Sequence, residues 1–210
     1  MAATGLNFAY ESRMKTQLQR LFILGFILMT GCKANSNPGP GADSSNAAKP
    51  VTEKPVGSMV VAAVDFVSGA AIPQKYSCEG ENISPQLTWD ILPTGAKSLA
   101  LVCEDPDAPR GKFIHWVIYN IPPTEKGLGM NVTNATSFPN GTMQGLNGAG
   151  KVGYTGPCPP PGKPHRYFFH LFALNTVLDY AANMDHDKLL TAMQGHIIAE
   201  AETMGTYERK

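Results

Sequence analysis

The stretch SLALVCEDPDAPRGKFIHWVIYN, residues 98–120, decides how the rest of the chain is interpreted. Apolar residues alternate with small or polar ones in two runs that flank the insert DPDAPRGK, a pattern typical of half-buried β-strands. The Pro and Gly residues of the insert predict a loop. That loop carries Asp105 and Asp107, and His115 opens the second run. The stretch therefore predicts two strands joined by a stiff loop whose polar side chains lie at the rim of a sheet.

A second stretch, GYTGPCPPPGKPHRYFFHLFAL at residues 153–174, repeats this design. Its first half is rich in Gly and Pro, and its second half is an apolar run that predicts another strand. Cys158 lies in the loop, and His165 and Arg166 open the strand. We expect the two stretches to face each other across one pocket.

Composition favours one β-rich domain plus a tail. The chain has 210 residues, of which 43% are hydrophobic, enough for a substantial core. Its 17 Pro and 21 Gly residues predict many turns. The 17 basic and 17 acidic residues balance, and no basic run stands out, so a nucleic-acid partner is not expected.

The N-terminus resembles a secretory signal. Basic residues follow Met14, and residues 21–30 are apolar or small before Gly31 and Cys32. Ten residues span about 15 Å as a helix, whereas the hydrocarbon core measures roughly 30 Å, so a transmembrane anchor is not expected. The Gly31-Cys32 junction is similar to a bacterial lipobox, which predicts lipidation of Cys32. Plain secretion and an uncleaved anchor are the alternatives.

These features divide the chain into three parts. Residues 1–31 are the predicted signal region, for which Met14 is a better start than the thirteen residues before it. Residues 32–57 comprise the lipidated cysteine and a flexible tether, rich in Asn, Ser, Gly, Pro and Ala and without apolar periodicity. Residues 58–210 are the folded domain. The expected location is exported and membrane-anchored, on the periplasmic or cell-surface side.

The folded part is predicted to be an antiparallel β-sandwich with a C-terminal helix. The helix is predicted over Asp185 to Met204, because Leu189, Leu190, Met193, Ile197 and Ala201 recur at helical spacing. Asp185 or Asp187 would cap its start, and Gly205 would end it. The predicted strands, separated by turn signals, are residues 60–67, 87–89, 98–104, 113–121 and 166–174.

The cysteines set a limit on cross-linking. If Cys32 is lipidated, three remain, so at most one disulfide forms within the domain. The sequence does not identify the pair among Cys78, Cys103 and Cys158. Cys103 shares a strand face with Leu99 and is expected to be a buried structural thiol.

The polar residues of the two stretches allow several interpretations. The aspartates would cap backbone amides in a simple turn, and His115 alone would be a packed or exposed strand residue. Cys158 and His165 would form a nucleophilic pair in a hydrolase, oriented by Asp105 or Asp107. The Asp, His and Cys side chains would alternatively bind a metal, although no short ligand spacing supports this. We expect no metal and no cofactor.

Taken together, DPDAP from Asp105, the His115-Trp116 strand, and GYTGPCPP from Gly153 leading to His165 resemble the phosphatidylethanolamine-binding protein family. YSCEGENISPQLTW from Tyr76 and the ending GHIIAEAETMGTYER are similar to its bacterial Raf-kinase-inhibitor-like branch. The resemblance covers about residues 59–209. Trp116 after a single histidine, and Cys158 in the Gly-Pro-Pro loop, depart from the eukaryotic members.

The resemblance implies a β-sandwich with a small anion-binding pocket at one end and no catalysis. The implied ligand-binding residues are Asp105, Asp107, His115, Gly156, Pro159, Pro160, His165 and Tyr167. Tyr207 is expected near the pocket, whereas His196 in the C-terminal helix is expected to be packed or at the surface. The expected ligand is phosphate or a phosphorylated head group, and the expected role is binding while tethered to a membrane. Inhibition of a protease or kinase is an alternative, with no identifiable protein partner.

An anion pocket that contains two aspartates needs compensating charge. Protonated histidines would supply it, and their ordinary pKa near 6.5 makes such binding sensitive to pH. An aspartate would accept a hydrogen bond from a protonated phosphate, or it would orient a histidine from behind without touching the ligand.

Overall fold

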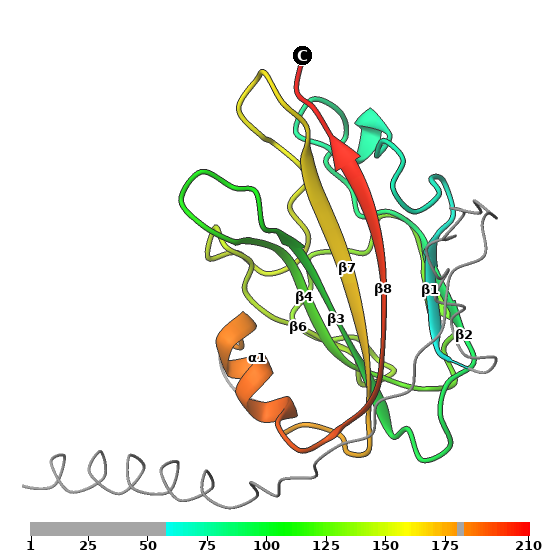
Figure 1. The fold of residues 1–210 in the computed structure, drawn as a ribbon. Helices are drawn as coiled ribbons and strands as arrows, with labels where there is room; N and C mark the ends of the chain where they lie inside the picture. Colours follow the sequence, from blue (N-terminus) through cyan, green and yellow to red (C-terminus); the bar gives the residue numbers. More distant parts are fainter. Residues whose placement is uncertain (1–57, 180–182) are drawn as a thin grey trace, which may run out of the picture. The chain divides into compact units, whose positions relative to one another are not determined.

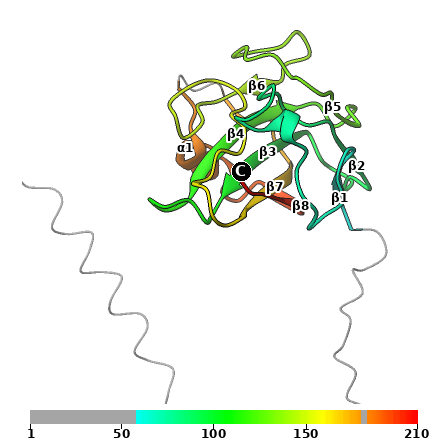
Figure 2. The same cartoon turned by 90° about the horizontal axis from the view of Figure 1, so that it is seen from above.

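The computed structural model describes residues 58–179 and 183–210, which form two β-sheets and one α-helix (Figures 1 and 2). The predicted signal region, Cys32 and the predicted tether lie outside the described residues. No helix within the described ranges is long and apolar enough to span a bilayer.

All strand pairs within the two sheets are antiparallel. The smaller sheet has the order β1-β2-β5 and consists of β1 (Val60–Ala63), β2 (Leu87–Asp90) and β5 (Gly127–Leu128). The larger sheet has the order β6-β4-β3-β7-β8 and consists of β6 (Met143–Gln144), β4 (Phe113–Ile121), β3 (Ser98–Asp105), β7 (His165–Leu174) and β8 (Ile197–Tyr207). The helices are the 3-10 turn η1 (Gln74–Tyr76) and α1 (His186–Met193).

The larger sheet is the middle layer of the domain, between the smaller sheet and α1 (Figure 1). Leu99 and Leu101 of β3 pack with residues of β1 and β2, whereas Ala100 and Val102 pack with Leu189 of α1. Both faces of β3 are covered, and its residues on both faces are accordingly buried and mostly apolar or small. The mostly β, antiparallel sandwich with one C-terminal helix is confirmed.

Four of the five predicted strands match β2, β3, β4 and β7 to within one residue at each end. The first is shorter than predicted, because β1 ends at Ala63 and the chain leaves the sheet there. The short strands β5 and β6 carry too few residues for a periodic signal, and they were not predicted.

The predicted helix over residues 185–204 is wrong in its second half. Asp185 caps the helix as expected, its side chain accepting a hydrogen bond from the Lys188 amide at 2.9 Å. The helix ends at Met193, and Gly195 then adopts a φ of +76°, which favours glycine and ends helices. Residues 197–207 form β8, which pairs with β7 along its whole length. Gly205 lies inside that strand and does not end a helix.

His196 is therefore not a helical residue. It lies in the turn between α1 and β8, half-buried, with its Nδ1 2.9 Å from the Asn175 side-chain oxygen. His196 was expected to be packed or at the surface, and its half-buried position agrees with that expectation.

One disulfide joins Cys78 to Cys158, and Cys103 is a free, buried thiol. Burial raises the pKa of the Cys103 thiol well above its ordinary value. The predicted buried structural thiol is confirmed. The structure also identifies the disulfide-bonded pair, which the sequence alone did not.

A β-bulge in β4 lies next to the predicted site residues. Cys103 pairs with Trp116 and Glu104 pairs with Ile114, so His115 is an extra residue opposite β3. Ile114 packs on the α1 side of the sheet, whereas Trp116 packs on the side of the smaller sheet. The bulge turns the His115 ring toward Tyr167 of β7. Simple alternation does not predict this orientation.

Candidate functional site

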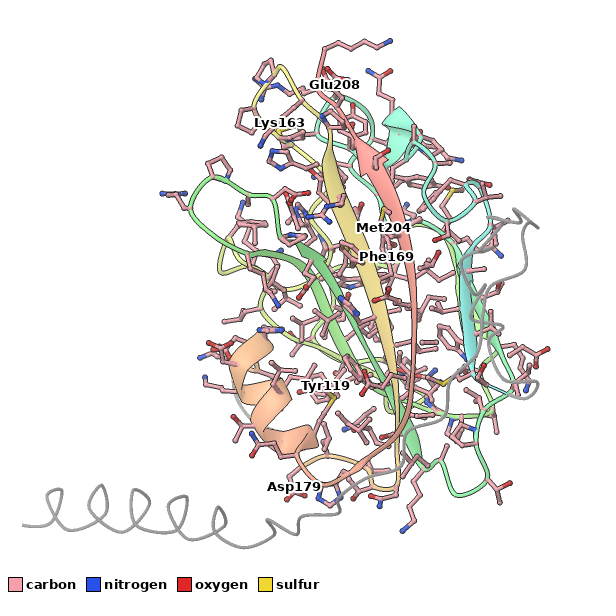
Figure 3. The ribbon with its side chains drawn as sticks, viewed as in Figure 1. Tyr119, Lys163, Phe169, Asp179, Met204 and Glu208 are labelled. Carbon is pink, nitrogen blue, oxygen red and sulfur yellow. A yellow bond between two sulfur atoms is a disulfide. The ribbon has the colours of Figure 1, made fainter. Side chains whose placement is uncertain are left out.

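The candidate site lies where β3 ends and β7 begins, at the end of the larger sheet that Lys163 and Glu208 mark in Figure 3. Asp105 is the last residue of β3, and His165 is the first residue of β7. The Nδ1–H of His165 donates to Oδ2 of Asp105 at 2.8 Å. The two residues are only 3% and 2% exposed, respectively. Because a carboxylate only accepts hydrogen bonds, this contact fixes the position of the proton on the ring.

Asp107 makes the second contact between the same two segments. The Arg166 side chain donates from Nε and from a terminal nitrogen to the two Asp107 oxygens, at 2.9 and 2.8 Å. The Arg166 backbone amide adds a third hydrogen bond at 3.0 Å. This fork lowers the pKa of Asp107 below its ordinary value, since it stabilises the carboxylate. Asp107 thereby holds the loop after β3 against β7, and its own oxygens are occupied.

His115 is held by backbone rather than by a carboxylate. Its Nδ1–H donates to the Thr155 carbonyl at 2.6 Å, and the Thr155 amide returns a hydrogen bond to the His115 carbonyl at 2.9 Å. The ring is packed edge-to-face between Phe113 and Tyr167. Burial lowers the pKa of His115 below its ordinary value, while hydrogen bonds to the backbone of Thr155 and Gly156 oppose that shift.

Tyr167 supplies a buried hydroxyl. The residue is 1% exposed, and its hydroxyl makes no hydrogen bond of ordinary geometry with the described residues, although the Asp105 carboxylate lies close enough to interact with it. Burial, together with the negative charge of Asp105, raises the pKa of Tyr167 well above its ordinary value, so the hydroxyl keeps its proton. A buried donor of this kind is costly unless something accepts from it. It lies beside His115, with the ring centroids 5.1 Å apart.

Gly156 is required by a close approach of two loops. A side chain at this position would collide with the Tyr76 carbonyl and with Asn82. The Gly156 amide donates to the Asn82 side-chain oxygen at 2.7 Å, so this amide is already engaged. Asn82 has a φ of +57°, a conformation that asparagine tolerates better than most residues. The sequence analysis did not single out Asn82 as a site residue, although it lies within the YSCEGENISPQLTW motif that begins at Tyr76.

The remaining predicted residues lie on the rim. Pro159 is buried and Pro160 is exposed, both beyond the disulfide-bonded Cys158. Tyr207 is opposite His165 in the pairing of β7 with β8. Its hydroxyl donates to Glu79 at 2.6 Å and accepts from Ser77 at 2.7 Å.

The structure thus gathers Asp105, His115, His165 and Tyr167 into one buried cluster, with Gly156 beside His115. It changes two expectations for individual side chains. Asp107 is paired with Arg166, and Cys158 is paired with Cys78. A cysteine in a disulfide has no thiol, so the hydrolase that would use Cys158 as nucleophile does not fit this structure.

The described residues contain no group of three or more His, Cys, Asp and Glu side chains arranged to hold a metal ion. A separate apolar cavity of about 360 Å³ lies at the other end of β4. It is lined by Ile118, Ile121, Leu128, Val132 and Phe138 among others. None of the predicted site residues lines it.

Comparison with known proteins shows the family and the fold of this chain. The family described as phosphatidylethanolamine-binding protein matches residues 63–208. The chain belongs to this family. A UPF0098 protein from the archaeon Methanothermobacter thermautotrophicus is 54% identical over 144 residues, which cover 69% of this chain and 95% of that protein. The bacterial Raf-kinase-inhibitor-like branch stays a prediction.

Two solved structures share the fold. A phosphatidylethanolamine-binding protein homologue from Chlamydia trachomatis has 43% sequence identity and a TM-score of 0.68, covering 73% of this chain and 99% of its own. YbcL of Escherichia coli, described as a new member of the mammalian family, has 35% identity and a TM-score of 0.67, covering 72% and 99%. The matched part of this chain therefore corresponds to nearly the whole length of each crystallised relative.

Proposed function

We propose that the domain binds a small phosphorylated anion at the cluster of His115, His165 and Tyr167. The observation that carries this proposal is the buried Tyr167 hydroxyl, a donor that makes no hydrogen bond of ordinary geometry with the described residues and whose ring packs against the His115 imidazole. Phosphate oxygens accept hydrogen bonds from groups of this kind. In both histidines Nδ1 is committed, to Thr155 or to Asp105, so Nε2 is the ring nitrogen left for a ligand.

The two aspartates have different roles in this proposal. Asp105 lies behind His165 and accepts a hydrogen bond from its Nδ1–H, so that Nε2 is the ring nitrogen left for the anion. Asp107 does not contact the ligand, because Arg166 occupies its oxygens. One carboxylate thus orients a histidine, and the charge of the other is neutralised by Arg166. This arrangement accounts for an anion site that contains two acidic residues.

Binding is expected to weaken as the pH rises. Burial lowers the pKa of His115, so the free protein holds this ring neutral near pH 7. An anion favours the protonated ring, and binding therefore takes up a proton. Affinity should be higher near pH 6 than near pH 8.

In the cell, the proposed site is held at a membrane surface. The predicted signal region, the lipidated Cys32 and the tether of residues 32–57 would place the domain on the outer side of a membrane. A disulfide between Cys78 and Cys158 fits an oxidising, exported environment. Labelling of the expressed chain with a fatty acid, lost in Cys32→Ala, tests the anchor. A chain labelled equally in both forms would contradict it.

The binding test is an NMR titration of residues 58–210, the part that corresponds to nearly whole relatives, with inorganic phosphate and phosphoethanolamine at about pH 6 and pH 8. We expect saturable shifts of the Thr155 and Gly156 amides. Tyr167→Phe removes only the hydroxyl and should weaken binding by about two- to tenfold, as loss of one hydrogen bond does. His165→Gln should weaken it further.

The matched control is His196→Gln, which changes a histidine outside the cluster and should bind as the unaltered domain does. Absence of saturable shifts with both ligands at pH 6 would overturn the proposal. Shifts from phosphoethanolamine alone would assign the site to the head group rather than to free phosphate.

A further inference from the structure

The disulfide lies at the border of the candidate site. Cys78 follows η1, and Cys158 lies in the loop that leads to β7, so the bond joins positions 80 residues apart. Both cysteines are exposed to solvent, unlike the buried Cys103. A soluble reductant therefore has access to this bond in the folded protein.

The same two loops are joined by three hydrogen bonds on the side of the site. The Cys78 amide donates to the Pro157 carbonyl at 3.0 Å. The Gly156 amide donates to Asn82 at 2.7 Å, and the Tyr154 hydroxyl donates to the Tyr76 carbonyl at 3.0 Å. These bonds hold residues 154–157 and would persist without the disulfide. Residues 159–164, which follow Cys158, make no such hydrogen bond to the other loop within the described structure.

Residues 159–164 form the segment between the disulfide-bonded Cys158 and the start of β7. Four of the six are proline, which cannot donate a backbone hydrogen bond. Apart from a turn within the segment itself, at Pro161 and Gly162, no hydrogen bond joins these residues to another part of the described chain. The segment is held at one end by Cys158 and at the other by His165, which belongs to the site. The disulfide is therefore its anchor on the N-terminal side.

We propose that the Cys78–Cys158 disulfide is a redox-sensitive clamp on the proposed anion site, opened by a dithiol reductant. The dithiol gives two electrons and two protons, the S–S bond breaks into two cysteine thiols, and the reductant becomes a disulfide. Cys103 takes no part, because it is buried within the core. The oxidised form holds the site in its binding geometry, and the reduced form binds the anion more weakly.

The weaker binding follows from lost preorganisation. With the bond open, residues 159–164 and Cys158 sample more conformations, and a bound anion has to order them again. The fold itself persists, since the five-stranded sheet and its two core clusters do not include either cysteine. This inference rests on the proposed function, and the test separates the two.

The test measures phosphate affinity of residues 58–210 at pH 6 by NMR, before and after reduction with dithiothreitol. Thiol titration establishes that two new thiols have formed. We expect the dissociation constant for phosphate to rise on the order of tenfold on reduction, as loosening of a preorganised loop does. The backbone NMR order parameters of Gly162 and Lys163 should fall on reduction, a change that needs no ligand. The Cys78→Ser/Cys158→Ser variant should reproduce both effects.

Cys103→Ala is the matched control, because it removes a thiol and keeps the disulfide; its oxidised form should bind phosphate as the unaltered domain does. If oxidised and reduced forms bind equally, the clamp is overturned and the anion site stands. If the oxidised form binds no phosphate, the proposed function fails, and the clamp on it fails as well. A disulfide that resists dithiothreitol until the domain unfolds, or a reduced domain that loses its dispersed spectrum, would make the bond a structural cross-link and overturn the clamp.

Discussion

Asp105 and Asp107 are separated by one proline, and each pairs with one of two successive residues of β7. Asp105 binds His165 in the interior, where the side chains are 5% and 2% exposed. Asp107 binds Arg166 at the surface, where the side chains are 24% and 53% exposed. The same residue type, in the same loop, thus makes one buried pair and one solvated pair across the same two strands.

The two pairs differ in whether water can take the place of a lost partner. If the buried pair is broken, the remaining polar group has no solvent to turn to, whereas both members of the surface pair can be hydrated. The buried pair also contains His165, whose Nε2 is left for the proposed ligand. We infer that the first pair carries the function of the motif and that the second positions the loop.

Removal of the buried partner is expected to have the largest effect on stability. Asp105→Ala leaves the His165 Nδ1–H without an acceptor in the interior, and it should lower the free energy of unfolding by about 3 kcal/mol. Chemical denaturation of residues 58–210 measures this. Asp105 Oδ1 also accepts from the Asp107 amide at 2.8 Å, so Asp105→Asn keeps one of the two acceptors and should lose less than Asp105→Ala. Equal losses in both variants would mean that the carboxylate contributes through its charge and not through this hydrogen bond.

Removal of the surface partner should cost less. Asp107→Ala is expected to lower the free energy of unfolding by about 1 kcal/mol or less, because solvent and salt screen the pair. A double-mutant cycle with Arg166→Ala isolates the coupling, which should shrink in 1 M salt. Because the pKa of Asp107 is lowered, the stabilisation that this pair gives is present above the ordinary aspartate pKa and is lost as the pH falls below it. A coupling that salt does not change would contradict the solvated character of this pair.

The third contact, between His115 and the Thr155 carbonyl, sharpens the comparison and should give the smallest effect. Burial lowers the pKa of His115, so the folded domain binds fewer protons than the unfolded chain. Stability should be complete above the ordinary histidine pKa near 6.5 and should decline as the pH falls toward the lowered value. Denaturation curves from pH 7.5 to 5 measure this slope, and His115→Gln should remove its share. An unchanged slope in that variant would assign the pH dependence elsewhere.

Sequence periodicity predicted the strands of the larger sheet well where both faces are covered. The runs at β3, β4 and β7 carry strong apolar alternation, and Pro and Gly mark the loops between them. It failed at β8, where the buried positions are small or polar residues such as Ala201, Thr203 and Gly205. The preceding Leu189 and Met193 fit a helical spacing that Ile197 continues by coincidence. Gly195 was the signal that could have ended the helix correctly.

The candidate site was predictable as a set of residues but not as an arrangement. Asp105, His115 and His165 stand beside Pro and Gly at strand ends, and that pattern is visible in one dimension. The different roles of the two aspartates are not visible in the sequence, because they depend on which side of β7 each partner faces. Asn82 was missed for the same reason: its role comes from a loop that lies far away in the sequence.

The sequence by itself determined the class of fold and the chemistry available, because hydrophobic periodicity, proline and glycine act on neighbouring residues. Tertiary structure alone decided which cysteines pair, which carboxylate is buried and where the bulge turns His115 toward Tyr167. These features depend on contacts between segments that are tens of residues apart. Apolar alternation predicts which strand residues are buried, as at Cys103, but it does not tell which of two nearby aspartates is buried, because that depends on the packed domain.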